Sequence, residues 1–503
     1  MGRPDDRRAG RRGSVRGRRL ARALVVGLAA VSARAHAIPL DDPNIGGIGF
    51  SGPTTGDLGS VYWNPAALGL LHGLQITFAG TADYATTTVR RAPFDGMVFP
   101  SARSQGLTQP LAWPPGPGAF AAAGSDVGGD RFSLAFATFM PYSERVTYGS
   151  AADPMNPTRY HRIAADLRNL ALVPALAIRL SGDLRLGFAP GFLFSTGHLS
   201  FDEPTCPPDP SAPCPAENPN GDARYDIASS SGLSSAKFAF TLGGGLYYRR
   251  RTWEFGVAFS SRPFGGEGPS PAGISGVDTL VTRPMRDGGT GLTCMNGRAD
   301  GRGCVFANVS YNLPFVITAG TTWHPRAGGE LSAIARVLSF PAHDVLDIRV
   351  IGASLEVSGL PEHIVLYRGY GTVYDVRLRY AQWLGEGIRL GTGLRVESSA
   401  LPSDAVSPAA VDGLKVQPTG MILVRLTKRI SITAGYGFTY MFDVTATNSV
   451  FDPNAANACQ GAGGDLRSTA CMTRLDGKAR PTAAGTYGTT RHDFSLSLTT
   501  RFF

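Results

Sequence analysis

The feature that most constrains this chain is an alternation of apolar and polar side chains with a period of two residues. In ISITAGYGFTYMF (430–442), Ile432 and Tyr436 fall on one face, and Thr433 and Gly435 fall on the other. A helix cannot place such a pattern on one face, whereas successive side chains of a β-strand point to opposite faces. The segment is therefore predicted to be a strand with one apolar and one polar face.

The same alternation recurs along most of the chain. In LRLGFAPGFLFST, for example, Leu186 and Phe192 share a face opposite Arg185 and Gly187. Fourteen strand cores are predicted, near residues 74–84, 118–126, 131–140, 164–180, 183–198, 233–249, 252–261, 311–324, 329–339, 368–383, 386–397, 415–427, 429–442 and 490–502.

Both a soluble β-sandwich and a transmembrane barrel have alternating strands, but three features favour the barrel. The polar face consists of Gly, Ser, Thr and charged residues, as in a wet lumen. Most strands are about ten residues or longer, which is enough to cross a bilayer when tilted. Connections after even-numbered strands are tight, such as SGD and LGEG, while those after odd-numbered strands are long. The predicted fold is an all-β, antiparallel outer-membrane barrel of about 14 strands.

The N-terminus is predicted to be a secretory signal peptide over residues 1–37. Nine arginines up to Arg22 precede the apolar run ALVVGLAAVSA and small residues at Ala35 and Ala37, the candidate cleavage positions. A membrane anchor is the alternative, but the run is too short to span a bilayer. This leader holds 10 of the 48 basic and 2 of the 39 acidic residues, which leaves the rest of the chain at a net charge of +1. The basic pI therefore gives no reason to expect a nucleic-acid partner.

Six cysteines occur as three local pairs in Pro-, Gly- and Asn-rich stretches: Cys206 and Cys214, Cys294 and Cys304, and Cys459 and Cys471. An exported chain passes through an oxidising compartment, so three local disulfides are predicted within long loops. A zinc site is the alternative, but no histidine lies near any pair.

No motif points to catalysis, a cofactor or a metal. GIGFSG (47–52) matches G-x-G-x-x-G, but no strand precedes it, so a nucleotide site is not expected. No nucleophile-elbow, zinc-protease or phosphate-loop motif occurs. An enzyme is therefore not expected, although an outer-membrane lipid hydrolase, whose site would be built across strands, is kept as an alternative.

Charged residues on the polar faces are predicted to face the lumen. An internal salt-bridge network is the main interpretation, and contact of one or two arginines with an anionic head group is the alternative. These candidates are Arg179, Arg185, Lys237, Arg377, Arg379, Arg389, Arg395 and Arg425, with Glu254, Glu330 and Asp375.

Three regions resemble the FadL/TodX family of outer-membrane transporters for long-chain fatty acids and other hydrophobic compounds. The first begins at GIGFSGPTTGDLGSVYWNPAALGLL, the second runs from RLGTGLRVESSALPSDAVSPAAVDG to GYGFTY, and the third is the closing GTYGTTRHDFSLSLTTRFF. Together they suggest a match over most of residues 42–503. The long cysteine-bearing loops depart from the better-known members of the family, so the identity of the ligand is not transferred.

The resemblance implies that residues 38–73 form a small hatch inside the lumen and that residues 74–503 form the barrel. Pro65 restricts its own backbone and that of Asn64, whose side chain commonly bonds within its own turn. A turn that simply precedes the first strand is the alternative. The residues assigned to the hatch are Asp57, Asn64, Pro65, Ala66, Leu68, Leu70 and Leu71.

The expected function is passive uptake of hydrophobic molecules by outer-loop capture, lumen binding, hatch movement and lateral release near the third strand, where Pro141 lies. Candidate capture residues are Phe94, Met97, Val98, Phe99, Leu107, Leu111 and Trp113. The competing interpretations are a structural or adhesive barrel and a hydrophilic porin. Expected partners are a hydrophobic ligand, outer-membrane lipid or lipopolysaccharide, and the barrel-assembly machinery that reads the C-terminal strand. A monomer in the outer membrane of a Gram-negative-type cell is expected.

Overall fold

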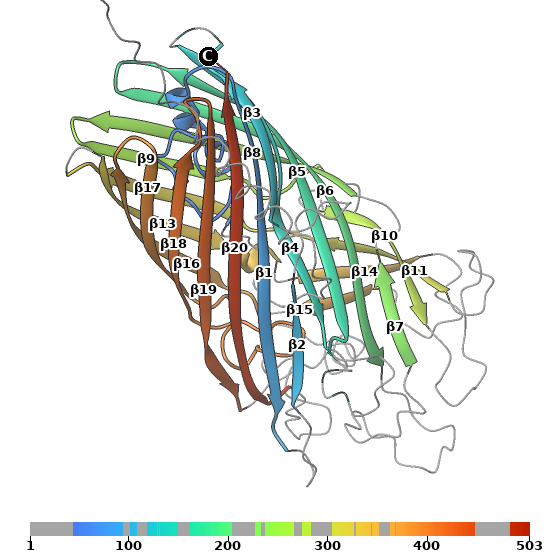
Figure 1. Ribbon diagram of the computed structural model, residues 1–503. Coiled ribbons are helices and arrows are strands. Elements are labelled where there is room, and N and C mark those ends of the chain that lie inside the picture. Colours follow the sequence, from blue (N-terminus) through green and yellow to red (C-terminus); the bar gives the residue numbers. More distant parts are fainter. Residues whose placement is uncertain are drawn as a thin grey trace, which may run out of the picture.

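A computed structural model gives the arrangement of most of the chain. It describes residues 44–93, 101–107, 118–127, 129, 131–148, 156, 158, 161–203, 227–232, 237–265, 274–282, 304–325, 328–343, 345–351, 363–367, 369–447 and 483–502. Within these residues, fourteen antiparallel strands form one closed ring (Figure 1). The predicted fold class is confirmed.

Each ring strand pairs with the next, and the last pairs with the first. The ring strands are β1 (Gln75–Arg91), β3 (Ala119–Ser125), β4 (Phe132–Thr147), β5 (Ala164–Arg179), β6 (Leu184–Glu203), β8 (Lys237–Arg250), β9 (Trp253–Ser260), β12 (Phe315–Trp323), β13 (Gly329–Ser339), β16 (Thr372–Leu384), β17 (Ile388–Glu397), β18 (Lys415–Arg425), β19 (Ile430–Ala446) and β20 (Gly485–Arg501). All fourteen predicted cores fall on these strands.

Six further strands lie in segments that were predicted to be long loops, and that part of the prediction is wrong. They are β2 (Ala102–Leu107), β7 (Ile227–Gly232), β10 (Ile274–Thr282), β11 (Cys304–Tyr311), β14 (Val345–Ile351) and β15 (His363–Tyr367). β2 pairs with β1, and β7 pairs with β6 and β10. Pairing continues from β10 through β11 and β14 to β15. Neighbouring strands supply backbone partners here, so sequences such as ARSQGL become strands without an apolar face.

The third ring strand, β4, continues beyond its predicted end. Pro141 therefore lies inside β4 rather than at its end, and the β4–β5 register shifts between Phe139 and Tyr142. A proline lacks the backbone N–H that a sheet ladder needs, which is why such residues are found at bulges.

The two faces of the ring differ as the alternation predicts. Large apolar side chains such as Phe188 and Val257 are about half exposed on the outside. Trp253 and Trp323 stack on neighbouring strands at the end with the short turns, with ring centroids 5.8 Å apart. Aromatic residues at this level are typical of the membrane interface of outer-membrane barrels.

The short helices are α2 (Ser60–Trp63), η1 (Pro65–Leu70) and η3 (Phe340–His343). No helix in the described part of the chain is long and apolar enough to cross a membrane.

Adjacent residues near the middle of β8 test which face meets lipid. Leu242 is exposed on the outer face, whereas Thr241 borders an internal cavity. We expect Leu242→Arg to lower the free energy of unfolding by about 2–4 kcal/mol, because the charge enters hydrocarbon. Thr241→Arg should cost less, since it enters the lumen. Urea unfolding in lipid vesicles measures both, and equal losses would contradict this orientation.

Candidate functional site

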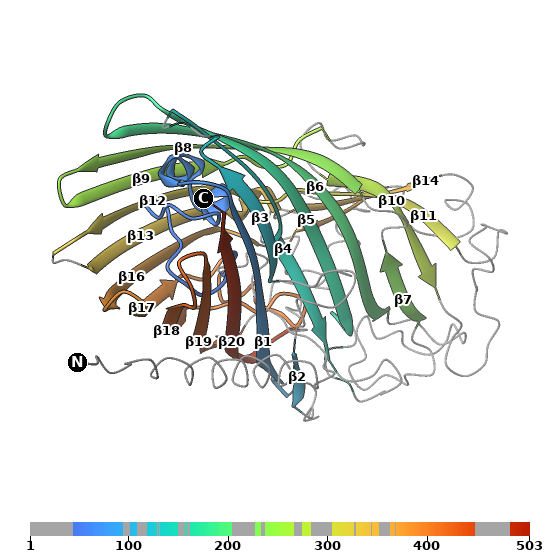
Figure 2. The same ribbon diagram turned by 45° about the horizontal axis from the view of Figure 1, so that its top comes forward.

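Residues 44–73, called the N-terminal segment below, lie inside the ring at the end with the short turns (Figure 2). The segment touches strands from all around the wall: Ile48 bonds to Ser495 on β20, Thr54 to Thr322 on β12, and Asn64 to Leu246 on β8. Leu58, Ala66, Ala67 and Leu68 are completely or almost completely buried. The segment thus contacts the wall on several sides of the lumen at this level.

Both polar atoms of the Asn64 side chain form hydrogen bonds, two within the segment and one to the wall. Its Nδ2 donates to the carbonyls of Pro53 at 2.7 Å and Leu246 at 2.9 Å, and its Oδ1 accepts from Ala66 N at 3.1 Å. Pro65 follows as the first residue of η1, where its missing N–H leaves no donor unsatisfied. The Asn-Pro pair therefore starts the 3₁₀ helix and anchors it to β8.

Glycines of the wall make room for this close approach. A Cβ at Gly187 would overlap Ala66, at Gly245 it would overlap the Asn64 side chain, and at Gly256 it would overlap the Pro53 carbonyl. These residues lie on β6, β8 and β9, so the lumen-facing glycines of three successive strands form a shallow bed for the segment. This explains part of the high glycine content of the chain.

Aromatic side chains of the segment cover a buried ion cluster on the wall. Asp375, which is fully buried, accepts from Arg377 and from Arg395 Nε at 3.1 Å, and Arg336 Nη1 lies 3.6 Å away. The guanidinium of Arg377 lies 4.8 Å from the Trp63 ring centroid. A buried carboxylate with several cationic partners is the arrangement in which such charges are tolerated. The cluster also provides a flat cationic surface on which the segment stacks.

Arg336 also donates from Nη2 to the Tyr62 hydroxyl at 2.6 Å, and its guanidinium lies 5.1 Å from the Trp63 ring centroid. Arg336 was missed as a candidate from the sequence. The alternation could have identified it, because Arg336 lies on the same inward face of β13 as Glu330, which was a candidate.

The Asp57 carboxyl does not hold the segment to the wall through an ion pair. Burial raises the pKa of its carboxyl above the usual 3.8, and the Ser51 hydroxyl and the charge of Arg379 only partly offset this. Its Oδ2 accepts from Ser51 Oγ at 2.7 Å, within the segment itself. Docking of the segment therefore rests on hydrogen bonds, stacking and shape rather than on this charge.

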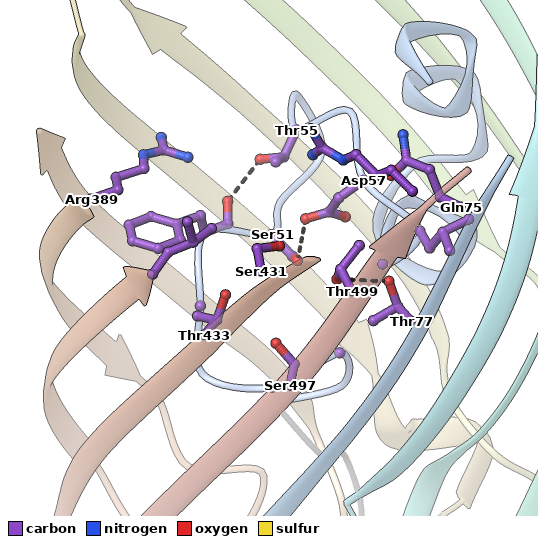
Figure 3. Close-up of a pocket in the computed structure, with 18 of the residues that line it drawn as sticks. Ser51, Thr55, Asp57, Gln75, Thr77, Arg389, Ser431, Thr433, Ser497 and Thr499 are labelled. Carbon is purple, nitrogen blue, oxygen red and sulfur yellow. Dashed lines mark hydrogen bonds between the residues drawn. The ribbon is translucent and has the colours of Figure 1, made fainter. Parts of the chain in front are cut away.

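Two cavities lie on opposite halves of the lumen. An apolar cavity of ≈ 60 Å³ is bordered by Tyr62, Trp63 and Pro65 of the segment and by side chains of β4, β5, β6, β8, β9 and β12. A second cavity of ≈ 180 Å³, called the vestibule below, lies between the segment and β1, β17, β18, β19 and β20 (Figure 3). Ser and Thr side chains and five cations line much of the vestibule wall.

The structure places the other predicted site residues as follows. Of the hatch residues, Asn64, Pro65, Ala66, Leu68 and Leu71 are buried, and Asp57 and Leu70 are half-buried. The inward charges Arg185, Arg377, Arg389 and Arg395 are nearly buried, and Arg185 Nε donates to Gly69 O at 3.0 Å. Glu254 is buried, and Arg389 pairs with Glu330. Arg179 and Arg425 lie at the short turns and donate to carbonyls there, while only the backbone of Lys237 is described.

Several predictions fall on residues that the structure does not describe. These are the capture residues Phe94, Met97, Val98, Phe99, Leu111 and Trp113, and the cysteines 206, 214, 294, 459 and 471. Leu107 ends β2 and Cys304 begins β11, but only their backbones are described. The three disulfides stay a prediction. In the described residues no group of His, Cys, Asp and Glu is placed to hold a metal.

Substitution of a wall glycine tests whether the close approach holds the segment in place. We expect Gly245→Ala to displace the segment, because its Cβ would overlap Asn64, and to speed cleavage of residues 44–73 by an added protease. Gly420→Ala is the matched control, since nothing lies within 4 Å of a Cβ there. Both variants should keep the heat-modifiable mobility of a folded barrel. Equal protection of the segment in both would contradict the glycine bed.

Comparisons with known proteins agree with this geometry. Residues 26–262 match the family described as outer membrane protein transport protein (OMPP1/FadL/TodX). No match is found among curated protein sequences. Among solved structures, a Pseudomonas aeruginosa FadL homologue superimposes with a TM-score of 0.69 at 13% identity, covering 93% of this chain and 100% of that one.

Two toluene transporters have the same fold. The structure of Ralstonia pickettii TbuX gives a TM-score of 0.55 at 12% identity, and that of Pseudomonas putida TodX gives 0.56 at 12% identity. Each comparison covers 93% of this chain and 99% of the other. The resemblance to the FadL/TodX family is therefore confirmed, and the chain is an outer-membrane barrel of the Gram-negative type with the fold of that family's hydrophobic-compound transporters.

Proposed function

We propose that this barrel takes up hydrophobic compounds passively, by a movement of the N-terminal segment that opens the apolar cavity. The observation that carries the proposal is the position of this cavity, which the segment closes from the end with the short turns. Its lining includes Phe139, Val173, Leu193 and Val316. Burial of an apolar molecule there is favourable by roughly 0.8 kcal/mol per CH₂ group.

The size of the cavity supports movement of the segment. Its ≈ 60 Å³ has room for on the order of four or five water molecules, which is much less than the volume of a long alkyl chain. A larger molecule fits only if a wall of the cavity moves. Val61, Tyr62, Trp63 and Pro65 are the part of this wall that the segment contributes, and nearly all of the rest belongs to the strand ladder.

The wall next to the cavity supports release to the side. Pro141 and Tyr142 of β4 border the cavity at the point where the β4–β5 register shifts. On its other side, β4 pairs with β3 only from Leu134 to Phe139. We infer that a molecule leaves between strands here, into the membrane, while the cavity supplies its last binding site in the lumen.

Capture at the outer surface and the choice of ligand complete the proposal. Capture is assigned to the hydrophobic residues between β1 and β3, from Phe94 to Trp113. The named ligands of the similar barrels are monoaromatic compounds such as toluene. We propose a hydrophobic ligand of that kind or a long-chain fatty acid, carried by a monomer that acts as a transporter and not as an enzyme.

The double substitution Asn64→Ala with Pro65→Ala tests this function. It removes the bonds to Pro53 and Leu246 and changes the part of η1 that borders the cavity. We expect slower uptake of a radiolabelled long-chain fatty acid or toluene by cells, with unchanged heat-modifiability of the barrel. Thr447→Ala, at an exposed position just beyond the far end of β19, is the control at equal surface abundance. If the double variant transports as fast as the parent, the segment does not shape the uptake route.

A further inference from the structure

A short stretch of the N-terminal segment is the shared wall of two cavities that are both lined by several arginines. Residues Gly47–Ser51, called the glycine strip below, border the vestibule on one side. On the other side, Gly47, Ile48, Gly49 and Ser51 border a cavity of ≈ 40 Å³ that Trp63, Arg377, Arg379 and Arg395 also line. The strip contains no helix or strand, so a single stretch of irregular chain separates the two spaces.

Few contacts hold the strip against the wall. Ser495 Oγ accepts from Ile48 N at 2.8 Å and lies 3.2 Å from Ile48 O. Arg379 donates to the carbonyls of Gly49 and Ser51. The wall also lacks a side chain at Gly435, where a Cβ would overlap the Ile48 carbonyl. The separation of the two cavities by the strip thus depends on a few backbone contacts and on the lack of a side chain at Gly435.

The Phe50 ring lies at the edge of the strip and stacks on the Arg389 guanidinium of the wall. The Arg389 guanidinium lies 4.2 Å from its ring centroid, and a Cβ at Gly391 would lie 2.7 Å from the ring. Figure 3 shows Arg389 on one side of the strip and Ser431, Thr433 and Ser497 along the wall of the vestibule. This surface is hydrophilic, unlike that of the apolar cavity on the other half of the lumen.

Cations predominate among the charged residues that line both cavities. The lining includes five in the vestibule and three in the smaller cavity, against the single acid Asp57. These cations are Arg389, Arg425, Lys428, Arg429 and Arg501, and Arg377, Arg379 and Arg395. Acidic partners behind the surface neutralise some of them, as Asp375 does for Arg377 and Arg395 and as Glu330 does for Arg389. Arg379, Arg425, Lys428, Arg429 and Arg501 are left to give the path its positive potential.

We propose that the glycine strip closes a second, polar route through the barrel, which conducts small hydrophilic anions when the strip lifts from β19 and β20. The route is separate from the apolar cavity and needs no lateral opening. Ser and Thr hydroxyls solvate a passing anion, and arginines concentrate it at both ends. The strip includes most of the GIGFSG sequence, for which this is a structural use without a nucleotide.

Single-channel recording in planar bilayers with a KCl gradient tests the proposal. The parent protein should be mostly closed. Ser495→Ala removes both contacts to Ile48 without adding bulk and should raise the open fraction roughly tenfold, which corresponds to about 1.4 kcal/mol. Gly435→Ala is a second variant that displaces the strip sterically. Ser133→Ala, which removes a buried hydroxyl from the inward face of β4 away from these cavities, is the matched control and should behave as the parent.

The sign of the reversal potential identifies the ion. The openings should prefer chloride, and adding Arg425→Gln and Arg429→Gln to Ser495→Ala should weaken that preference. Both arginines are exposed at the short turn between β18 and β19, so the fold should tolerate their loss. A parent that conducts steadily, a Ser495→Ala variant no more open than Ser133→Ala, or openings that prefer potassium would each overturn the proposal.

Discussion

Closure of the ring between the first and last strands is the constraint on which the rest of this structure depends. β1 and β20 pair without interruption from Gln75 with Arg501 to Arg91 with Gly485. An unpaired strand edge would leave N–H and C=O groups without partners in hydrocarbon, where each costs several kcal/mol. Fourteen closed strands enclose a lumen that their own side chains do not fill. The lumen therefore needs a second element, and the N-terminal segment provides it.

The way this segment is held suits a part that moves. Apart from its chain connection to β1, the described part of the segment has no strand that pairs with the wall. Its contacts are single hydrogen bonds such as that of Asn64 to Leu246, stacking of Trp63 on Arg377, and backbone contacts at glycines such as Gly187. Each hydrogen bond or stacking contact is worth on the order of 1–2 kcal/mol. In the proposed mechanism the segment lifts away while the ring of strands, with its continuous ladder, stays closed.

The two halves of the segment meet different surroundings. The α2–η1 half lies on an apolar cavity next to the irregular part of β4, and the glycine strip lies between two cavities lined by cations next to β16–β20. In our proposal, one inserted element thus closes two routes, one for hydrophobic molecules and one for small anions. A movement limited to one half would open one route and leave the other shut.

The ring could be predicted from the sequence because apolar and polar side chains alternate with a period of two residues in every wall strand. The added strands show where this signal weakens: ARSQGL in β2 has no apolar face, although VLDIRVI in β14 alternates and was missed. The side chains that face the lumen could also be predicted from the sequence, and Arg185, Arg377 and Arg395 lie on the inward face as the alternation predicts. Contacts such as Gly245 with Asn64 join residues far apart in sequence and depend on register around the ring, which alternation within one strand does not encode.

The central claim is that the N-terminal segment must leave the wall during uptake, and a reversible tether tests it directly. Thr54 and Thr322 are buried, and their hydroxyl oxygens are 2.7 Å apart, close to where two sulfur atoms would bond. The variant Thr54→Cys with Thr322→Cys should lose uptake of a hydrophobic substrate when oxidised and regain it with a membrane-permeant reductant. Each single-cysteine variant should transport in both conditions. Undiminished uptake by a fully cross-linked protein would contradict the account.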